Sequence, residues 1–257
     1  MASEHDLSGK VALVTGGAGG LGRAVCQTLA DAGARVLVVD IDEPAARAVA
    51  ASIEGEFFAA DVSDLDQNHA MVETAITQLG GLDLVHLNAG VSSMFGVDES
   101  FDLERYRRVM GINLDGVVFG AHAALAGFER TGGGGAIVAT ASLAGLTSVP
   151  FDPLYAANKH AVVGLARSLG PALEPRGVRF NAVCPGFAES AIIEPIRGML
   201  AESGIPIIPA QRVADAVLAL FTGTMSGECW FVQAGREPAP FSFRGLPGPR
   251  PTEETAQ

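Results

Sequence analysis

Short apolar runs alternate with helical patterns along almost the whole chain, and this alternation most constrains what the chain can fold into. Seven runs are predicted as strands, at 11–15, 35–40, 56–59, 82–87, 136–141, 178–183 and 229–233. Helices are predicted from Leu21 to Gly33 and at 43–52, 65–79, 101–110, 113–129, 154–173 and 213–221. Strands that are apolar throughout lie buried on both faces, and intervening helices make their neighbours parallel.

The pattern therefore predicts an α/β fold, with a doubly wound, Rossmann-like sheet of about seven parallel strands between two layers of helices. A length of 257 residues fits one domain, predicted at 1–236, followed by a tail at 237–257 rich in Pro, Gly and Arg. The tail is expected to be loop or disordered. Ligands of such sheets bind at the carboxyl ends of the strands.

Charge and composition exclude several functions. A formal net charge of −12 without a basic stripe argues against a nucleic-acid partner. Three widely spaced cysteines and five scattered histidines give no metal-ligand pattern, so no metal is expected, and the cysteine usage favours a reducing cytoplasm. The polar, acidic start is unlike a signal peptide, and no apolar run approaches about 18 residues, so no membrane partner is expected.

A glycine-rich segment, Thr15–Gly22, joins the first predicted strand to the first predicted helix. Glycines let the backbone turn tightly and approach a pyrophosphate, whose charge a helix N-terminus stabilises. The candidate cofactor-binding residues here are Gly16, Ala18, Gly19, Gly20, Leu21 and Gly22. The alternative is a plain structural turn in a chain with 32 glycines.

Asp40 closes the second predicted strand, where a carboxylate can accept hydrogen bonds from the hydroxyls of an adenosine ribose. A 2′-phosphate would meet that carboxylate directly, and the next residue, Ile41, supplies no positive charge. Arg35 stands at the wrong end of the strand and Arg23 lies within the helix. The cofactor is therefore predicted to be NAD rather than NADP. The alternative for Asp40 is a carboxylate that only caps the following turn.

The chain has two tyrosines and two lysines, and one of each forms Tyr155-x3-Lys159, a coincidence of roughly 1.6% by chance. Residues four apart on a helix share a face, so the Lys159 ammonium should stand beside the phenol. A phenol normally has a pKa near 10, and a neighbouring cation favours its ionised form. Tyr155 is thus predicted as a general base with a lowered pKa; the alternative is an exposed tyrosine beside a solvated lysine.

Residues 7–235 resemble the short-chain dehydrogenase/reductase family through these motifs and others in the same order. The further matches are Asp61 and Val62, Asn88, Ala89 and Gly90, then Asn113, Ser142, and Pro185, Gly186 and Phe187. Asn181–Phe187 and the following Ala191-Ile-Ile are also similar to the hydroxyprostaglandin dehydrogenase branch. The departures include Leu87 in place of the family's first asparagine and Asn158 in place of its common serine.

The resemblance implies a role for each matched residue. Tyr155 would remove the hydroxyl proton of the substrate, Ser142 would hydrogen-bond the substrate oxygen, and Asn113 would anchor a water. Lys159 would also hold the nicotinamide ribose. Asp61 and Val62 would contact adenine, Asn88, Ala89 and Gly90 would brace the sheet, and Pro185, Gly186 and Phe187 would lie against the nicotinamide.

The sequence therefore predicts an NAD-dependent oxidoreductase that interconverts a secondary alcohol and a ketone. The alternatives are a ketone reductase of the same family and a non-catalytic NAD-binding scaffold. The segment 187–209 is predicted as a substrate lid, and its many apolar side chains predict an apolar substrate, steroid-like or a lipid hydroxy compound.

The resemblance also implies a homodimer or homotetramer, formed through the helices at 113–129 and 154–173. Past Gly235 no regular structure is expected. The stretch Phe241–Arg250 is nevertheless predicted to dock on a surface, more readily that of a neighbouring subunit than its own, because burying phenylalanine is favourable. The alternative is a disordered tail with incidental aromatic residues.

Overall fold

An eight-stranded sheet forms the centre of the computed structural model, which describes residues 5–245. Its strands are β1 (Val11–Thr15), β2 (Arg35–Asp40), β3 (Glu56–Ala59), β4 (Leu84–Leu87), β5 (Gly135–Thr140), β6 (Val178–Pro185), β7 (Cys229–Val232) and β8 (Ala239–Pro240). Their order is β3-β2-β1-β4-β5-β6-β7-β8, and β1 to β7 pair in parallel. The strand order reverses between β1 and β4, so a crevice opens there at the carboxyl ends of the strands.

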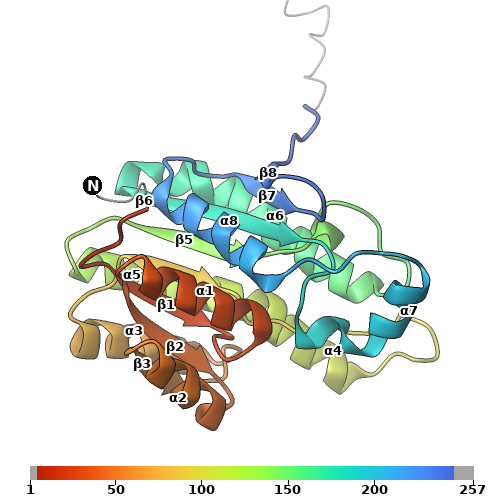
Figure 1. The fold of residues 1–257 in the computed structure, drawn as a ribbon, viewed down its shortest axis with the longest axis horizontal. Helices are drawn as coiled ribbons and strands as arrows, with labels where there is room; N and C mark the ends of the chain where they lie inside the picture. Colours follow the sequence, from red (N-terminus) through yellow and green to blue (C-terminus); the bar gives the residue numbers. More distant parts are fainter. Residues whose placement is uncertain (1–4, 246–257) are drawn as a thin grey trace, which may run out of the picture.

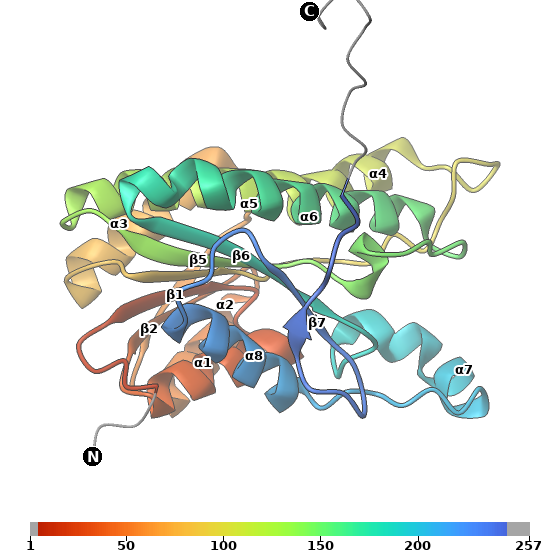
Figure 2. The ribbon, with the colours of Figure 1, turned by 90° about the horizontal axis from the view of Figure 1, so that it is seen from above.

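Helices cover both faces of the sheet. The helices α1 (Gly20–Asp31), α2 (Glu43–Ser52) and α8 (Ala210–Thr222) lie on one face, as Figure 1 shows. The helices α3 (Leu65–Leu79), α5 (Gly116–Arg130) and α6 (Pro153–Leu173) lie on the other, which is clearest in Figure 2. Both α4 (Leu103–Met110) and α7 (Arg197–Glu202) sit beyond the ends of the strands (Figure 1). The predicted three-layer α/β/α fold is confirmed.

The core divides into two apolar layers because neighbouring residues of a strand point to opposite faces of the sheet. On β1, Leu13 packs with the layer under α3, α5 and α6, whereas Ala12 and Val14 pack with the layer under α1, α2 and α8. The sheet is therefore covered on both faces, as a parallel sheet requires.

The two helices predicted at 101–110 and 113–129 form one continuous helical stretch instead. A π-helical turn, Gly111–Asp115, joins α4 to α5 without a break. By length and composition Leu103–Arg130 could cross a membrane, but half of its most apolar window is buried in the fold, as in a core helix. The π-turn contains Asn113, and such turns often occur at functional sites.

The predictions for the tail need correction. Past Gly235, β8 pairs antiparallel with β7 through Trp230–Pro240 and Phe231–Ala239, so regular structure does continue. Phe243 packs against the core of its own chain, with the Arg167 guanidinium 3.8 Å from its ring centroid. The predicted docking therefore occurs for Phe243, but on its own chain rather than on the neighbouring subunit that the prediction favoured. Residues 246–250 of the predicted segment lie outside the described residues.

Candidate active site

A cavity of about 980 Å³ opens at the carboxyl ends of β1, β4, β5 and β6. The glycine loop forms part of its lining. Ser142, which follows β5, and Tyr155 and Lys159 of α6 form another part. Every predicted site residue lines this cavity except Ala18 and Asn113; the lining set comprises Gly16, Gly19, Gly20, Leu21, Gly22, Asp40, Ile41, Asp61, Val62, Asn88, Ala89, Gly90, Ser142, Tyr155, Lys159, Pro185, Gly186 and Phe187.

The glycine loop leaves the start of α1 open to a ligand. Gly19 at the N-cap offers no side-chain hydrogen bond, and the first turn of α1 has no acidic residue. The unpaired N–H groups of that turn, with the positive end of the helix, therefore suit an anion. A Cβ on Gly20 would come within 2.7 Å of the Glu189 carbonyl oxygen, so no side chain fits at this wall. These features fit the pyrophosphate of a dinucleotide.

Asp40 stands beside this loop. Its Oδ2 accepts a hydrogen bond from the Ala18 N–H (3.0 Å) and its Oδ1 accepts one from Asp42 N–H (3.1 Å). Ala18 thus contributes by holding Asp40 rather than by lining the cavity. Ile41, which follows, lines the cavity and is 72% exposed, so its apolar side chain is free to cover a ligand.

The sequence placed Arg23 within the first helix, but its side chain extends back to the glycine loop. Its guanidinium lies 3.5 Å from the carbonyl oxygen of Ala18, the residue that also donates to Asp40. The Arg23 guanidinium is therefore a cation next to the glycine loop. Of Arg23 and Asp40, only Asp40 lines the cavity.

Asn88 joins the glycine loop to the strand that precedes Ser142. Its Nδ2 donates to the carbonyl oxygens of Thr15 (3.1 Å) and Gly16 (3.2 Å), and its Oδ1 accepts from Thr140 Oγ1 (3.1 Å). These bonds span β1, β4 and β5, which is the bracing that the resemblance implied. Thr140 Oγ1 also contacts Nε2 of the fully buried His86 (3.2 Å).

Tyr155, Ser142 and Lys159 meet at the end of β5. The Ser142 hydroxyl donates to the Pro185 carbonyl oxygen (3.3 Å), and both Ser142 and Tyr155 line the cavity. The buried Lys159 donates from Nζ to the carbonyl oxygen of Thr140 (2.7 Å), and its Nζ lies 5.6 Å from the centroid of the Tyr155 ring. A hydroxyl donor, a phenol and an ammonium thus face one space, as proton removal from an alcohol requires.

The pKa of Tyr155 differs from the sequence-based expectation. Desolvation raises the pKa of the phenol to about 12, despite the hydrogen bond from Ser142, which lowers it. Desolvation also lowers the pKa of Lys159 to about 8, so most Lys159 side chains are charged at neutral pH. The predicted lowering of the phenol pKa is therefore wrong for the chain by itself.

Asn113 is buried and does not line the cavity, and both ends of its amide bind the backbone of Val91. The Val91 N–H donates to Asn113 Oδ1 (2.8 Å), and Asn113 Nδ2 donates to the Val91 carbonyl oxygen (2.8 Å). The side chain therefore holds the loop after β4 in place.

The predicted lid closes one side of the cavity. Phe187, Ile192, Ile193, Ile196 and Ile205 line it, whereas Leu200 and Ile208 are buried beneath the lid. Backbone hydrogen bonds pin the two ends of the lid together, since Ile208 N–H donates to Phe187 O (2.7 Å) and Glu189 N–H donates to Ile208 O (3.0 Å). The substrate side of the cavity is therefore mainly apolar.

Sequence reasoning missed several polar groups of the cavity. Ser92, Asp152 and Gln233 line it, and Asp152 is almost fully buried. Asp152-Pro153 could be recognised from sequence only as the start of a helix, because Asp at the N-cap and Pro at N1 are common there. Nothing in the sequence pairs Asp152 with the serines after β4.

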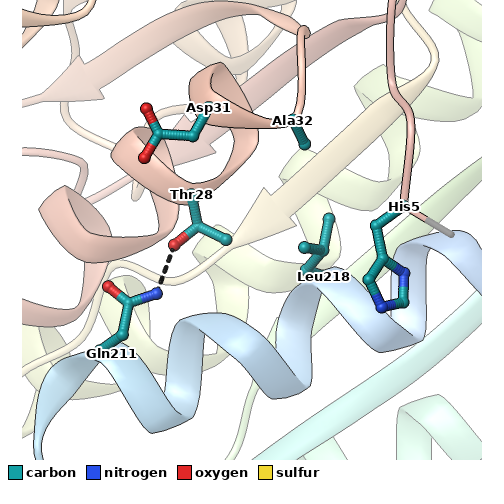
Figure 3. A pocket seen from close by; sticks show the side chains of 6 residues that line it. All are labelled: His5, Thr28, Asp31, Ala32, Gln211 and Leu218. Carbon is teal, nitrogen blue, oxygen red and sulfur yellow. Dashed lines mark hydrogen bonds between the residues drawn. The ribbon is translucent and has the colours of Figure 1, made fainter. Parts of the chain in front are cut away.

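Figure 3 shows a second hollow, of about 260 Å³, between α1 and α8. Gln211 Nε2 donates there to Thr28 Oγ1 (2.9 Å), and His5 and Asp31 also line it. It shares no lining residue with the main cavity. Within residues 5–245, no group of three or more His, Cys, Asp or Glu side chains is arranged to hold a metal ion.

Comparisons with known proteins agree with this geometry. A family model described as short chain dehydrogenase matches residues 10–200. The 2,5-dichloro-2,5-cyclohexadiene-1,4-diol dehydrogenase of Sphingobium indicum is 36% identical over 202 residues, covering 78% of this chain and 80% of the relative. The NAD(+) 15-hydroxyprostaglandin dehydrogenase of Homo sapiens is 36% identical over 201 residues, covering 74% and 72%.

Among solved structures, the 3-ketoacyl-(acyl-carrier-protein) reductase of Brucella melitensis, complexed with NADH, matches with a TM-score of 0.83 at 28% identity. The match covers 90% of this chain and 99% of that one. The chain belongs to the short-chain dehydrogenase family. It is an oxidoreductase with a Rossmann fold, and its predicted likeness to hydroxyprostaglandin dehydrogenase is confirmed.

Proposed function

We propose that this chain oxidises an apolar secondary alcohol to a ketone with NAD as hydride acceptor. The observation that carries the proposal is the single cavity, which contains Asp40 and the open start of α1 together with Ser142, Tyr155 and Lys159. A protein that only binds NAD would not need the phenol and the ammonium.

The roles of the residues follow from their contacts. Tyr155 takes the hydroxyl proton of the substrate while Ser142 donates a hydrogen bond to the same oxygen and stabilises the charge that develops there. Lys159, mostly protonated at neutral pH, favours the ionised phenol. Bound NAD would supply the hydride acceptor, and its positive ring would lower the pKa of Tyr155 from the raised value of the chain by itself.

The choice of NAD rests on Asp40. Its carboxylate lines the cavity and is already oriented by Ala18 N–H. It can accept hydrogen bonds from ribose hydroxyls, whereas a 2′-phosphate would bring like charges together. The human relative is named as an NAD(+) enzyme, which agrees with this assignment.

The substrate is a moderately large apolar alcohol, steroid-like or a lipid hydroxy compound. Phe187 and four isoleucines of the lid line the cavity, and Met94 and Phe151 from other segments add apolar surface. The human relative is named for a hydroxyprostaglandin, which is a lipid hydroxy compound. Reduction of a ketone with NADH is the second candidate, favoured by the likeness to the Brucella reductase in complex with NADH.

The three cysteines are free and buried, which supports a location of this chain in the reducing cytoplasm. The chain acts there as a homodimer or homotetramer, with α5 and α6 as its contact helices. The exposed Val118 on α5 and the open surface over Gly164 on α6 support this arrangement.

A test of the function measures NADH absorbance with NAD or NADP and a panel of secondary alcohols that runs from short sugar alcohols to steroids. We expect turnover with NAD and the larger apolar alcohols. Far better turnover of short sugar alcohols would refute the substrate class, and NAD binding without turnover of any alcohol would favour a scaffold.

A further inference from the structure

A buried carboxylate at the start of α6 links the loop after β4 to the catalytic tyrosine. Asp152 is the N-cap of α6, and its side chain is only 2% exposed. Its Oδ2 accepts from Ser92 Oγ (2.8 Å), and its Oδ1 accepts from Ser93 Oγ. The Tyr155 N–H is shared between Ser93 Oγ (3.2 Å) and Asp152 Oδ1 (3.4 Å).

This arrangement exceeds what helix capping needs. An N-cap carboxylate is usually exposed, as the caps Asp42 and Asp64 are, with one backbone donor each. Asp152 is buried, and within residues 5–245 no Lys or Arg side chain lies at ion-pair distance from it. Burying a carboxylate without a cation is costly, so its hydrogen bonds and the helix N-terminus must offset that cost.

The serine that Asp152 holds is itself anchored from the other side. Ser93 is 1% exposed, and its carbonyl oxygen accepts from an Arg105 guanidinium N–H of α4 (2.9 Å). The preceding Val91 is fixed by Asn113 of the π-turn. Asp152 therefore ties α6 to a loop that two other elements already hold rigid.

We propose that Asp152 is a positioning residue, which acts through Ser93 to fix the backbone of Tyr155 and, through its charge beside the cavity, sets the ionisation of the phenol. This inference rests on the proposed function. Desolvation is the main cause of the raised pKa of Tyr155, and the charge of Asp152 adds to it. The other groups that face the phenol are Ser142 and Cys184, which lie at the ends of β5 and β6, and Lys159 of α6.

Asp152→Asn separates the two effects. An asparagine keeps an acceptor for Ser93 and Tyr155 N–H but removes the charge, whereas Ser93→Ala keeps the charge and removes the serine link. We expect Asp152→Asn to move the pH midpoint of kcat/KM for alcohol oxidation lower by about half a unit or more, with kcat at its new optimum near that of the wild type. Ser93→Ala should lower kcat by about tenfold at an almost unchanged midpoint, because small displacements of a catalytic group are costly.

The direct measurement needs no substrate. The chain has only two tyrosines, so tyrosine labelled with carbon-13 at Cζ gives two NMR signals, and Tyr106→Phe identifies that of Tyr155. In the cofactor-free protein, we expect ionisation of Tyr155 to begin at lower pH in Asp152→Asn than in the wild type or in Ser93→Ala. Thermal unfolding of each variant confirms that it is folded.

An unchanged Tyr155 titration in folded Asp152→Asn, or a Ser93→Ala variant with wild-type kcat, would overturn the proposal. The titration also separates this inference from the proposed function. If the wild type oxidises no alcohol, the function fails, while the shift of the Tyr155 signal still decides whether the Asp152 charge controls the phenol.

Discussion

The proposed use of NAD assigns the discrimination between the two nicotinamide cofactors to Asp40. In Asp40→Ala we expect the preference for NAD over NADP to fall by about tenfold or more, because the repulsion of a 2′-phosphate disappears. The Arg23 guanidinium, 3.5 Å from the Ala18 carbonyl oxygen, remains as a cation beside the glycine loop. Equilibrium binding of both cofactors measures the effect.

Asp42→Ala is the matched control for Asp40→Ala. Asp42 is two residues away, is exposed and caps α2 by accepting from Ala45 N–H (3.1 Å), but it does not line the cavity. Its loss should lower stability without changing the cofactor preference. An unaltered preference in Asp40→Ala would show that discrimination lies elsewhere.

We expect His86 to make the free energy of unfolding depend on pH in the acid range. Burial lowers the pKa of this imidazole to about 3, well below its ordinary value of 6.5. Between these values the unfolded chain binds a proton that the folded chain does not, so the free energy of unfolding falls as pH decreases from about 6.5 toward 3. The slope should approach about 1.4 kcal/mol per pH unit from this residue.

Urea unfolding of the cofactor-free protein across that pH range tests the role of His86. His86→Asn should flatten the slope, whatever its effect on absolute stability. His160→Asn, at an exposed position on α6, is the comparison variant and should leave the slope as in the wild type. Equal slopes in wild type and His86→Asn would contradict the prediction.

Among the elements, β8 and the residues that follow it depend on contacts within the chain. Phe243 packs on the core and against Arg167, whereas Phe241 is 38% exposed and touches Phe243 edge-on. Phe243→Ala should therefore lower the free energy of unfolding by about 1–3 kcal/mol, and Phe241→Ala by clearly less. Light scattering should show the same mass for both variants as for the wild type; a lower mass in Phe243→Ala would mean that the tail also holds a neighbour.

The strands β1 to β7, most helices and much of the lining of the cavity could be predicted because each follows from local pattern or from motif spacing. The π-turn around Asn113 could not, since helical periodicity looks the same on both sides of it. Neither could β8, which is a two-residue strand containing Pro240 and has no strand pattern of its own. The link from Asp152 to Ser93 joins residues that are distant in sequence, so no local pattern reports it. The raised pKa of Tyr155 depends on burial, which a Tyr-x3-Lys motif does not report.

At the scale of the whole molecule, a substitution at Gly164 tests the proposed contact between subunits through α6. A Cβ there meets nothing within 4 Å, so Gly164→Arg fits the isolated chain but would block close approach of a second subunit. We expect the wild type to scatter light as a dimer or tetramer and Gly164→Arg to have a lower mass. Gly198→Arg on α7 offers equal space within the chain and should leave the mass unchanged. A monomeric wild type would refute the assembly.

The most direct test of the account is NADH formation by the wild type and by Tyr155→Phe, with one apolar secondary alcohol that the wild type oxidises. Phenylalanine keeps the ring but removes the group that takes the proton. Turnover should fall by at least about 10²-fold while NAD affinity stays nearly unchanged, since the glycine loop and Asp40 are untouched. Turnover within a few-fold of the wild type would contradict the central claim that Tyr155 is the base in this cavity.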